Sequence, residues 1–245
     1  MMVHIRRVAD VIVDVFAKIL HMKNNTQLTP KVPQSLPRGR HGLSREFVRT
    51  SQRTRLLDAM ADLTAEKGYV AVTIGDVVAR GCVAKRTFYE YFTDKEACLI
   101  AAGEYLAGEV AEAIVIPHDP DMPLYHRAAA TIRGLLQTLQ NHPSYARACL
   151  VEIWAVGPTA IKRRLEVSRQ LAQLLASLSL DVTRRQSNAR AIHETHALAV
   201  ISAIEGYLFR VIYFEGAHHL TDHVDTLAQL ATGFLNVDMS RLKVE

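Results

Sequence analysis

The side chains best placed to do chemistry lie between residues 73 and 96, and their pattern favours nucleic-acid binding over catalysis. The stretch has the pattern of a helix, a tight turn and a second short helix, which carries Lys85, Arg86 and Thr87 in its first turn and Tyr89 just after. Cations and hydroxyls at the exposed end of such a helix can reach base edges and phosphates in a DNA groove. The stretch therefore predicts a DNA-reading helix.

A helix and a tight turn are expected to position this reading helix. Thr73 and Asp76 have the spacing of a capping box, which would start a helix at residue 74. Gly81 and Cys82 fall where the turn must come. Ile74, Val77 and Val78 give the first helix one apolar stripe, and Val83, Phe88 and Phe92 can fill the space between the two helices.

A third helix is predicted to begin after Thr93, which forms a second capping box with Glu96. The free N–H groups of a helix start suit a phosphate. Tyr89 and Lys95 could each add a contact to the DNA backbone, which sets register rather than sequence choice.

The whole stretch resembles the helix-turn-helix of the TetR (tetracycline-repressor) family of bacterial regulators. That family runs Thr-apolar-x-x-Ile-Ala-x-x-Ala-Gly-Val-Ser-x-x-Thr-Leu-Tyr-x-x-Phe and then x-x-Lys-Glu. This chain matches without a gap at Thr73, Ile74, Val77, Val83, Thr87, Tyr89, Phe92, Lys95 and Glu96, with Phe88 replacing Leu. The resemblance implies a DNA-binding set of Thr73, Lys85, Arg86, Thr87, Tyr89 and Lys95.

Three departures from the family pattern matter. Cys82 stands at the turn glycine, and a positive φ there would cost about 1 kcal/mol. Ala84 replaces the usual Ser and so loses a helix cap typically worth ~1 kcal/mol. Arg86 stands where many members have Gly, and it adds a base reader or a phosphate clamp. The alternative interpretation is a structural helical hairpin with a solvated basic face.

Composition agrees with a nucleic-acid reader joined to a second unit. The net charge of +4 is uneven, because residues 1–95 hold 16 Lys and Arg against 9 Asp and Glu. The remainder is mildly acidic, with 13 against 16. The three cysteines, Cys82, Cys98 and Cys149, have no metal-ligand spacing and fit a reducing cytosol. We expect a cytoplasmic protein with no cofactor and no metal.

The first 43 residues are expected to form a flexible extension and basic linker. The apolar run 11–20 is too short and too charged to span a bilayer, and no signal-peptide cleavage site follows it. An Arg-rich run over 38–55 either enters a minor groove or stays solvated. The predicted division is 1–43 extension, 44–94 helix-turn-helix domain and 95–245 effector-binding and dimerisation domain.

The predicted fold class is all-α, because no segment alternates with period two. Helices are expected at about 44–67, 95–116, 124–140, 144–156, 157–180, 188–215 and 221–236. The helix 188–215 has two apolar stripes, which are predicted to face its own core and a partner chain. The first stripe is Leu198, Ile201, Leu208 and Ile212, and the second is Ala197, Val200, Ile204, Tyr207, Val211 and Phe214. The resemblance implies a homodimer through the last two helices, which suits a palindromic operator.

The middle helices are expected to enclose a pocket for a small-molecule effector. The candidate lining residues are Tyr105, Tyr125, Tyr145, Glu152, Trp154, His196 and Glu205. A buried carboxylate needs a partner, which either a ligand or a protein Arg or Tyr can supply, and the protein partner is favoured. His193 and His196 are three apart and do not form the zinc motif HExxH.

The sequence as a whole predicts a one-component transcriptional regulator, most often a repressor in this family. Two rival classes stay open. One is a helical-bundle enzyme that uses His196 and Glu205. The other is a DNA-packing protein with little sequence preference and a steep salt dependence.

Overall fold

The structure is a computed structural model that describes residues 44–113, 122–185 and 193–236, and every regular element in these ranges is helical. The all-α prediction is confirmed for them. The predictions made for residues 1–43 lie outside the described residues.

The first four elements form the unit that carries the predicted reading helix. They are α2 (Arg45–Lys67), the 3₁₀ turn η1 (Tyr69–Ala71), α3 (Ile74–Arg80) and α4 (Lys85–Tyr91). The Ser44 hydroxyl caps α2 by accepting from the Phe47 N–H at 3.1 Å. Gly68 ends α2 as predicted, with φ +78°, a conformation that glycine adopts without strain.

The helix α5 (Lys95–Ala113) follows, and its cap differs from the prediction. The Asp94 carboxylate, and not the Thr93 hydroxyl, accepts from the Ala97 N–H at 2.7 Å. The Thr93 hydroxyl instead donates to Asp94 at 3.2 Å. A carboxylate is the stronger acceptor and also suits the positive end of the helix dipole, so the predicted Thr93–Glu96 capping box is wrong.

The remaining elements form a helical bundle. They are α6 (Leu124–Asn141), α7 (Pro143–Leu150), η2 (Glu152–Ala155), α8 (Pro158–Arg185), α9 (Glu194–Phe214), η3 (Leu220–His223) and α10 (Val224–Asn236). The predicted helix 144–156 is in fact α7 followed by the separate turn η2. Gly157, with φ +150°, then separates that turn from α8.

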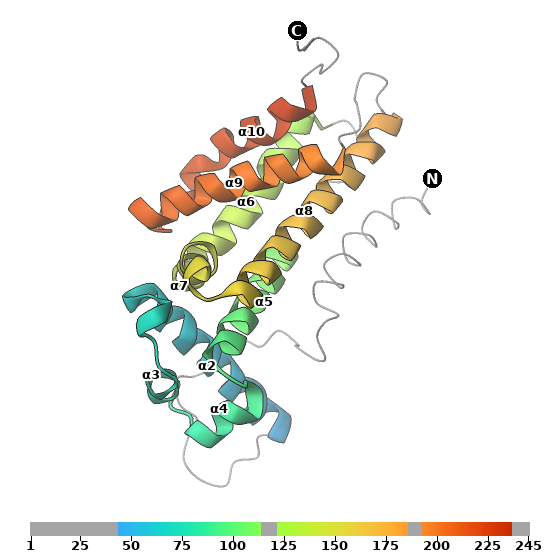
Figure 1. The fold of residues 1–245 in the computed structure, drawn as a ribbon. Helices are drawn as coiled ribbons and strands as arrows, with labels where there is room; N and C mark the ends of the chain where they lie inside the picture. The colour runs from blue at the N-terminus through green and yellow to red at the C-terminus, as the bar shows by residue number, and fades with distance from the viewer. Residues whose placement is uncertain (1–43, 114–121, 186–192, 237–245) are drawn as a thin grey trace.

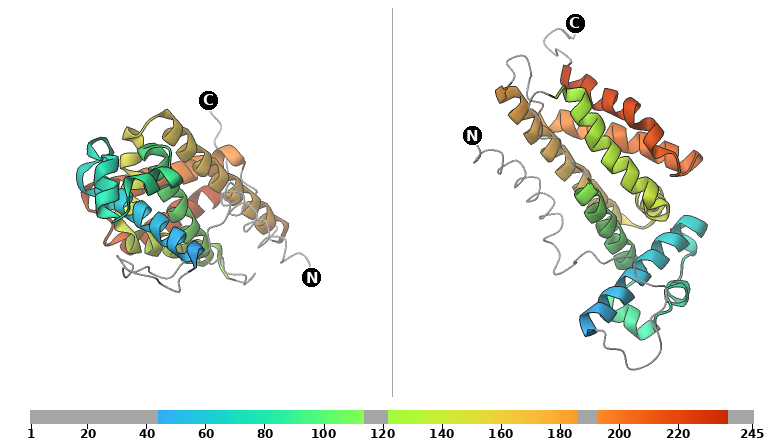
Figure 2. Two further views of the ribbon diagram at one scale, coloured as in Figure 1. Left: turned by 90° about the horizontal axis from the view of Figure 1, so that it is seen from below. Right: turned by 180° about the vertical axis from the view of Figure 1, so that it is seen from behind.

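The two parts of the molecule lie at opposite ends of an elongated body (Figure 1). The helices α3 and α4 lie at one tip, α9 and α10 lie toward the other end, and α5 runs from the first part into the second. Two further views show the same separation of α3 and α4 from α9 and α10 (Figure 2). The core is nevertheless continuous, because α2 packs against α3 and α5 and also against α7 of the bundle.

The helix α9 is central to the bundle and contacts α7, α8 and α10. The helix is long and apolar enough to cross a membrane, judged by length and composition only. About a third of its most apolar 18-residue stretch is buried against the rest of this chain. Members of both predicted stripes share the buried face, among them Val200, Ile204, Leu208 and Ile212. The predicted assignment of the two stripes to separate faces is therefore wrong. The exposed face of α9 instead carries small residues, including Ser202, Ala203 and Gly206.

Candidate nucleic-acid interface

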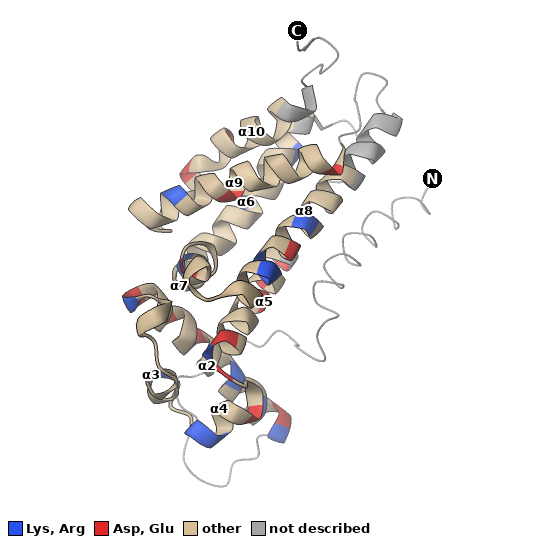
Figure 3. Ribbon diagram, viewed as in Figure 1, with Lys and Arg blue, Asp and Glu red and all other residues tan. Residues whose placement is uncertain are grey.

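The first turn of α4 presents its cations to solvent at the tip of the molecule. Lys85 is exposed, and the Arg86 side chain is 92% exposed. Arg86 lies 3.6 Å from Glu90 one turn later, an exposed pair that holds it weakly. Figure 3 shows the basic start of α4 at the end of the molecule remote from α9 and α10. The helix thus presents an exposed guanidinium and an exposed ammonium to solvent.

The opposite face of α4 is anchored by aromatic packing. Phe88 is fully buried, and its ring lies 5.5 Å from that of Phe92. Tyr89, the next residue, is 53% exposed and packs edge-on against Phe88 at 5.6 Å. Thr87 is half-buried. Because Phe88 is buried, the cations of the first turn and Tyr89 point to solvent. The sequence predicted this orientation of α4.

The turn between α3 and α4 shows what the backbone requires at Gly81 and at Cys82. Cys82 has φ +49°, so the strained conformation predicted for it is present. A Cβ added at Gly81 would lie 3.2 Å from the carbonyl oxygens of Arg55 and Val77. Glycine at 81 therefore avoids a tight contact with the α2 backbone, while the positive φ falls on Cys82. Arg55 also donates to the Cys82 carbonyl at 3.4 Å.

The start of α4 has no side-chain cap, because Ala84 occupies the N-cap position. We expect Ala84→Ser to raise the free energy of unfolding by about 1 kcal/mol, since its hydroxyl could accept from an orphan N–H of the first turn. Urea unfolding of both proteins at one concentration measures the change. Ala84→Val is the control, and equal stabilities of the Ser and Val variants would contradict the capping role.

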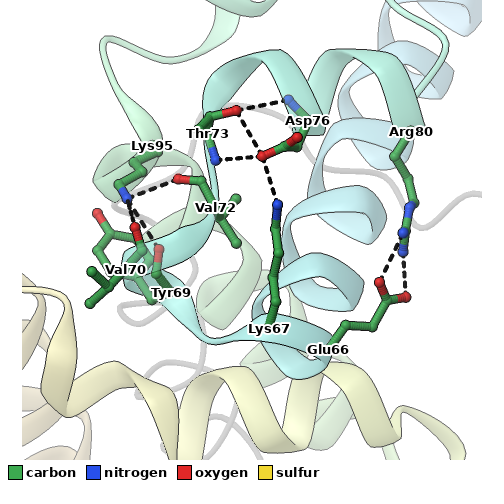
Figure 4. A network of polar contacts seen from close by, with 9 residues as sticks. All are labelled: Glu66, Lys67, Tyr69, Val70, Val72, Thr73, Asp76, Arg80 and Lys95. Atoms are coloured by element: carbon green, nitrogen blue, oxygen red, sulfur yellow. Dashed lines mark hydrogen bonds and ion pairs between the residues drawn. The ribbon is translucent and has the colours of Figure 1, made fainter.

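The helix α3 is fixed to the end of α2 by a polar network (Figure 4). Thr73 and Asp76 form the predicted capping box, and the Thr73 hydroxyl also donates to Asp76 at 2.7 Å. Lys67 donates to Asp76 at 2.8 Å, and Arg80 pairs with Glu66. The Lys67 ammonium, followed by the Thr73 bonds, holds the pKa of Asp76 well below its ordinary value. The network orients α3 more than it stabilises it, because exposed ion pairs contribute little.

Lys95, predicted to contact a phosphate, has its ammonium directed at the protein backbone. It donates to the carbonyls of Val72, Tyr69 and Val70 at 2.9, 3.1 and 3.3 Å. It also lies 4.3 Å from the centre of the Tyr69 ring. The Lys95 side chain therefore joins the first turn of α5 to η1, a contact that its position in the motif does not reveal.

The residues predicted to line an effector pocket lie on α5, α6, α7, η2 and α9. Tyr105 and Tyr145 lie together, with ring centres 5.4 Å apart, beside His142. The Tyr145 hydroxyl donates to Asp58 of α2 at 2.7 Å. Burial raises the pKa of Tyr105 to about 12, and burial with the Asp58 charge raises that of Tyr145 further. This pair therefore joins α5 and α7 to the DNA-reading part.

Three further members of the predicted set lie elsewhere. The Tyr125 hydroxyl of α6 donates to Asp225 of α10 at 2.9 Å. Glu152 and Trp154 lie in η2, with Glu152 3.8 Å from Arg147. They line an open surface groove of about 600 Å³ together with Val151, Ala155, Phe209 and Tyr213.

The last two members lie on α9. His196 is exposed near the start of the helix. Glu205 accepts from Arg164 at 2.8 Å and from Ser168 at 2.8 Å, both on α8. A protein Arg thus supplies the partner that a buried carboxylate needs, as the favoured prediction had it. The pairing residue Arg164 was missed, because α8 and α9 are far apart in sequence at this point.

The comparisons with known proteins agree with this geometry. Residues 56–102 match the family model described as bacterial regulatory proteins, tetR family. An uncharacterized HTH-type transcriptional regulator, YxbF of Bacillus subtilis (strain 168), is 29% identical over 102 residues. That alignment covers 41% of this chain and 26% of the relative, so it spans about a quarter of the relative's length.

Solved structures share the fold over most of the chain. The fatty acid degradation regulator FadR from Bacillus halodurans is 18% identical with a TM-score of 0.61, covering 74% of this chain and 97% of that one. FadR from Bacillus subtilis, in complex with stearoyl-CoA, is 17% identical with a TM-score of 0.62, covering 74% and 98%. A TetR-family regulator from Syntrophomonas wolfei is 22% identical with a TM-score of 0.59, covering 76% and 98%. Members of this family are soluble DNA-binding regulators. Together with the helix-turn-helix geometry, these matches show that residues 56–102 are a DNA-binding domain of the tetR family of bacterial regulatory proteins.

Proposed function

We propose that the protein is an effector-responsive repressor that binds a palindromic operator as a homodimer in the cytoplasm. The observation that carries this proposal is α4, whose first turn exposes Lys85 and Arg86 while Phe88 is fully buried behind them. A helix held in this way can enter a major groove without moving its anchor. Residues 44–94 would form the DNA-binding domain, and 95–245 the effector-binding and dimerisation domain.

The residues of α4 are assigned separate roles. Arg86 and Lys85 would read bases or clamp phosphates, while Thr87 and Tyr89 would fix the register on the DNA backbone. The Thr73 hydroxyl is engaged by Asp76, so a DNA contact from this residue would be secondary to its capping.

Selection of bound sequences from random DNA by the purified chain tests the proposal. An inverted repeat with half-sites about 10 bp apart is expected, because two recognition helices of a dimer must reach successive major grooves. Recovery of unrelated sequences with a steep salt slope would instead support the DNA-packing rival.

Arg86→Ala is expected to relax the preference at one base pair in each half-site. The loss of discrimination should be about 1–3 kcal/mol if the guanidinium contacts a guanine with two hydrogen bonds. Titrations of wild type and mutant against all single-base variants of the selected operator measure it. Glu90→Gln is the control, since it frees Arg86 from its weak ion pair without removing it. A uniform loss across all variants would show that Arg86 does not read a base.

The dimer is proposed to form through α9 and α10. Ser202, Ala203 and Gly206 give α9 an exposed face of small side chains, and a Cβ added at Gly206 would meet nothing within 4 Å. Gly233 of α10 has the same open surroundings. Small residues let two helices approach closely, and an isologous interface would place the same face of each copy together.

The effector is proposed to be a small molecule bound among the helices that follow residue 95. The stearoyl-CoA bound by the FadR neighbour makes long-chain acyl-CoA the first class of compound to test. Release of the operator requires that the ligand prefer the state in which the recognition helices are out of register. A compound that binds the free protein and the operator complex equally well would not act as an inducer.

The positions of His196 and Glu205 do not support the rival hypothesis of a helical-bundle enzyme. His196 and Glu205 are nine residues apart on one helix, which separates them by about 13 Å along its axis. Glu205 is also engaged by Arg164 and Ser168. We therefore propose a non-enzymatic protein, and turnover of a substrate without binding to operator DNA would contradict this.

A further inference from the structure

We propose that Lys95 is a positioning residue that holds the helix-turn-helix on α5, and that it does not contact a DNA phosphate. This inference rests on the proposed function, because it assigns the residue that sets the reading unit in place. It starts from the ammonium of Lys95 and the three carbonyl oxygens that surround it (Figure 4).

A lysine ammonium has three N–H donors, and all three are used here. The acceptors are the carbonyls of Val72, Tyr69 and Val70, at 2.9, 3.1 and 3.3 Å. The Tyr69 ring, 6% exposed as a residue, covers the ammonium from a centroid distance of 4.3 Å. A phosphate bond would require the loss of one of these carbonyl bonds, so DNA binding gains little from this cation.

The carbonyls belong to the segment that leads directly into α3. Tyr69 and Val70 lie in η1 and Val72 directly follows it, and the Tyr69 carbonyl also accepts from the Val72 N–H at 3.1 Å. Val72 is followed by Thr73, the N-cap of α3. The ammonium therefore fixes the point from which α3, and through it α4, departs.

The side chain of the neighbouring residue lies close to the start of α8. The Glu96 carboxylate lies 3.7 and 3.8 Å from the position of a Cβ on Gly157, where the chain turns into α8. Lys95 and Glu96 thus place one turn of α5 between η1 and the start of α8. A displacement of that turn in the bundle would be passed to α3 through the three bonds of Lys95.

Amine labelling of the wild-type chain tests this without any risk to folding. We expect Lys95 to react about tenfold or more slowly than the exposed Lys85 in the free protein, because its donors are engaged. Selected operator DNA should then protect Lys85 and leave the rate at Lys95 unchanged. Rapid labelling of Lys95 that operator DNA suppresses would overturn the proposal.

Two variants separate positioning from phosphate contact. Lys95→Met keeps most of the side-chain length but removes the ammonium. It should lower the ratio of operator affinity to random-DNA affinity by about tenfold or more. The slope of log affinity against log salt concentration should not change. Lys85→Met is the matched control and should lower the slope by about 1 per half-site contact if Lys85 meets a phosphate. Affinities are measured per folded protein, so that a mere loss of stability does not move the ratio.

The outcomes separate the role of Lys95 from the proposed function of the protein. A lower slope for Lys95→Met with an unchanged ratio would make Lys95 a phosphate contact. An unchanged ratio and slope would deny it any part in positioning. If the wild-type chain selects no operator, the proposed function fails, while slow labelling of Lys95 in the free protein still shows that its donors are engaged.

Discussion

Replacing Arg164 by Met is expected to lower the free energy of unfolding by about 3 kcal/mol. The mutation leaves the Glu205 carboxylate between α8 and α9 with the Ser168 hydroxyl as its remaining partner. The two charged side chains are only 13% and 22% exposed, so water cannot replace the lost guanidinium fully. Urea unfolding at a fixed chain concentration measures the effect, since the proposed dimerisation would make stability concentration-dependent.

The double variant Arg164→Met with Glu205→Leu is the control for this prediction. Removing both charges together should recover most of the lost stability, because well-packed apolar side chains often replace a buried ion pair without cost. A single variant as stable as wild type would mean that Glu205 is adequately solvated. If a Glu205→Gln variant keeps its stability but no longer responds to an effector, Glu205 would be assigned to the ligand site.

A charge on the exposed face of α9 is expected to separate the dimer. Ala203→Glu should give a folded monomer, because two carboxylates would be brought together and desolvated at an isologous interface. Operator affinity should fall by about 100-fold or more, since each half-site alone offers one recognition helix and half the phosphate contacts. Light scattering and operator titration measure the two effects.

The control is Ala113→Glu, which places the same charge at the exposed end of α5. It should remain dimeric and bind the operator like wild type. Val211→Asp and Ile212→Asp are expected to behave differently from both, and to give an insoluble chain, because these residues are 5% and 1% exposed in their own core. A soluble dimer of normal stability from Ala203→Glu would exclude this face from the interface.

The reading unit could be predicted closely from the sequence because its signals are local. Caps and turns act over three or four residues, so Ser44, Gly68, Thr73 and Asp76 mark helix ends that the structure confirms. The alignment with the family's turn glycine raised a positive φ at Cys82 as a condition, and the structure has it. The start of α5 was predicted less well, since Thr93 and Asp94 both fit a cap and only the three-dimensional turn selects Asp94.

The contacts of the bundle could not be predicted, because they join residues far apart in the sequence. Tyr145 meets Asp58 across 87 positions, and Arg164 meets Glu205 across 41. A hydropathy stripe also fixes the rotation of a helix only to within about a quarter of a turn. On α9 that uncertainty was enough to assign Val211 and Ile212 to possible interface faces, although they are core residues.

The burial of α2 on two sides has a consequence for how this protein can be taken apart. Between residues 56 and 64 almost every α2 side chain is buried, some against α3 and α5 and others against α7. Excising residues 44–102 would remove α7 and expose to water the part of α2 that packs against it. Chimaeras that exchange DNA specificity between relatives should therefore carry the matching α7 sequence, because the helix-turn-helix unit of this chain shares its core with α7.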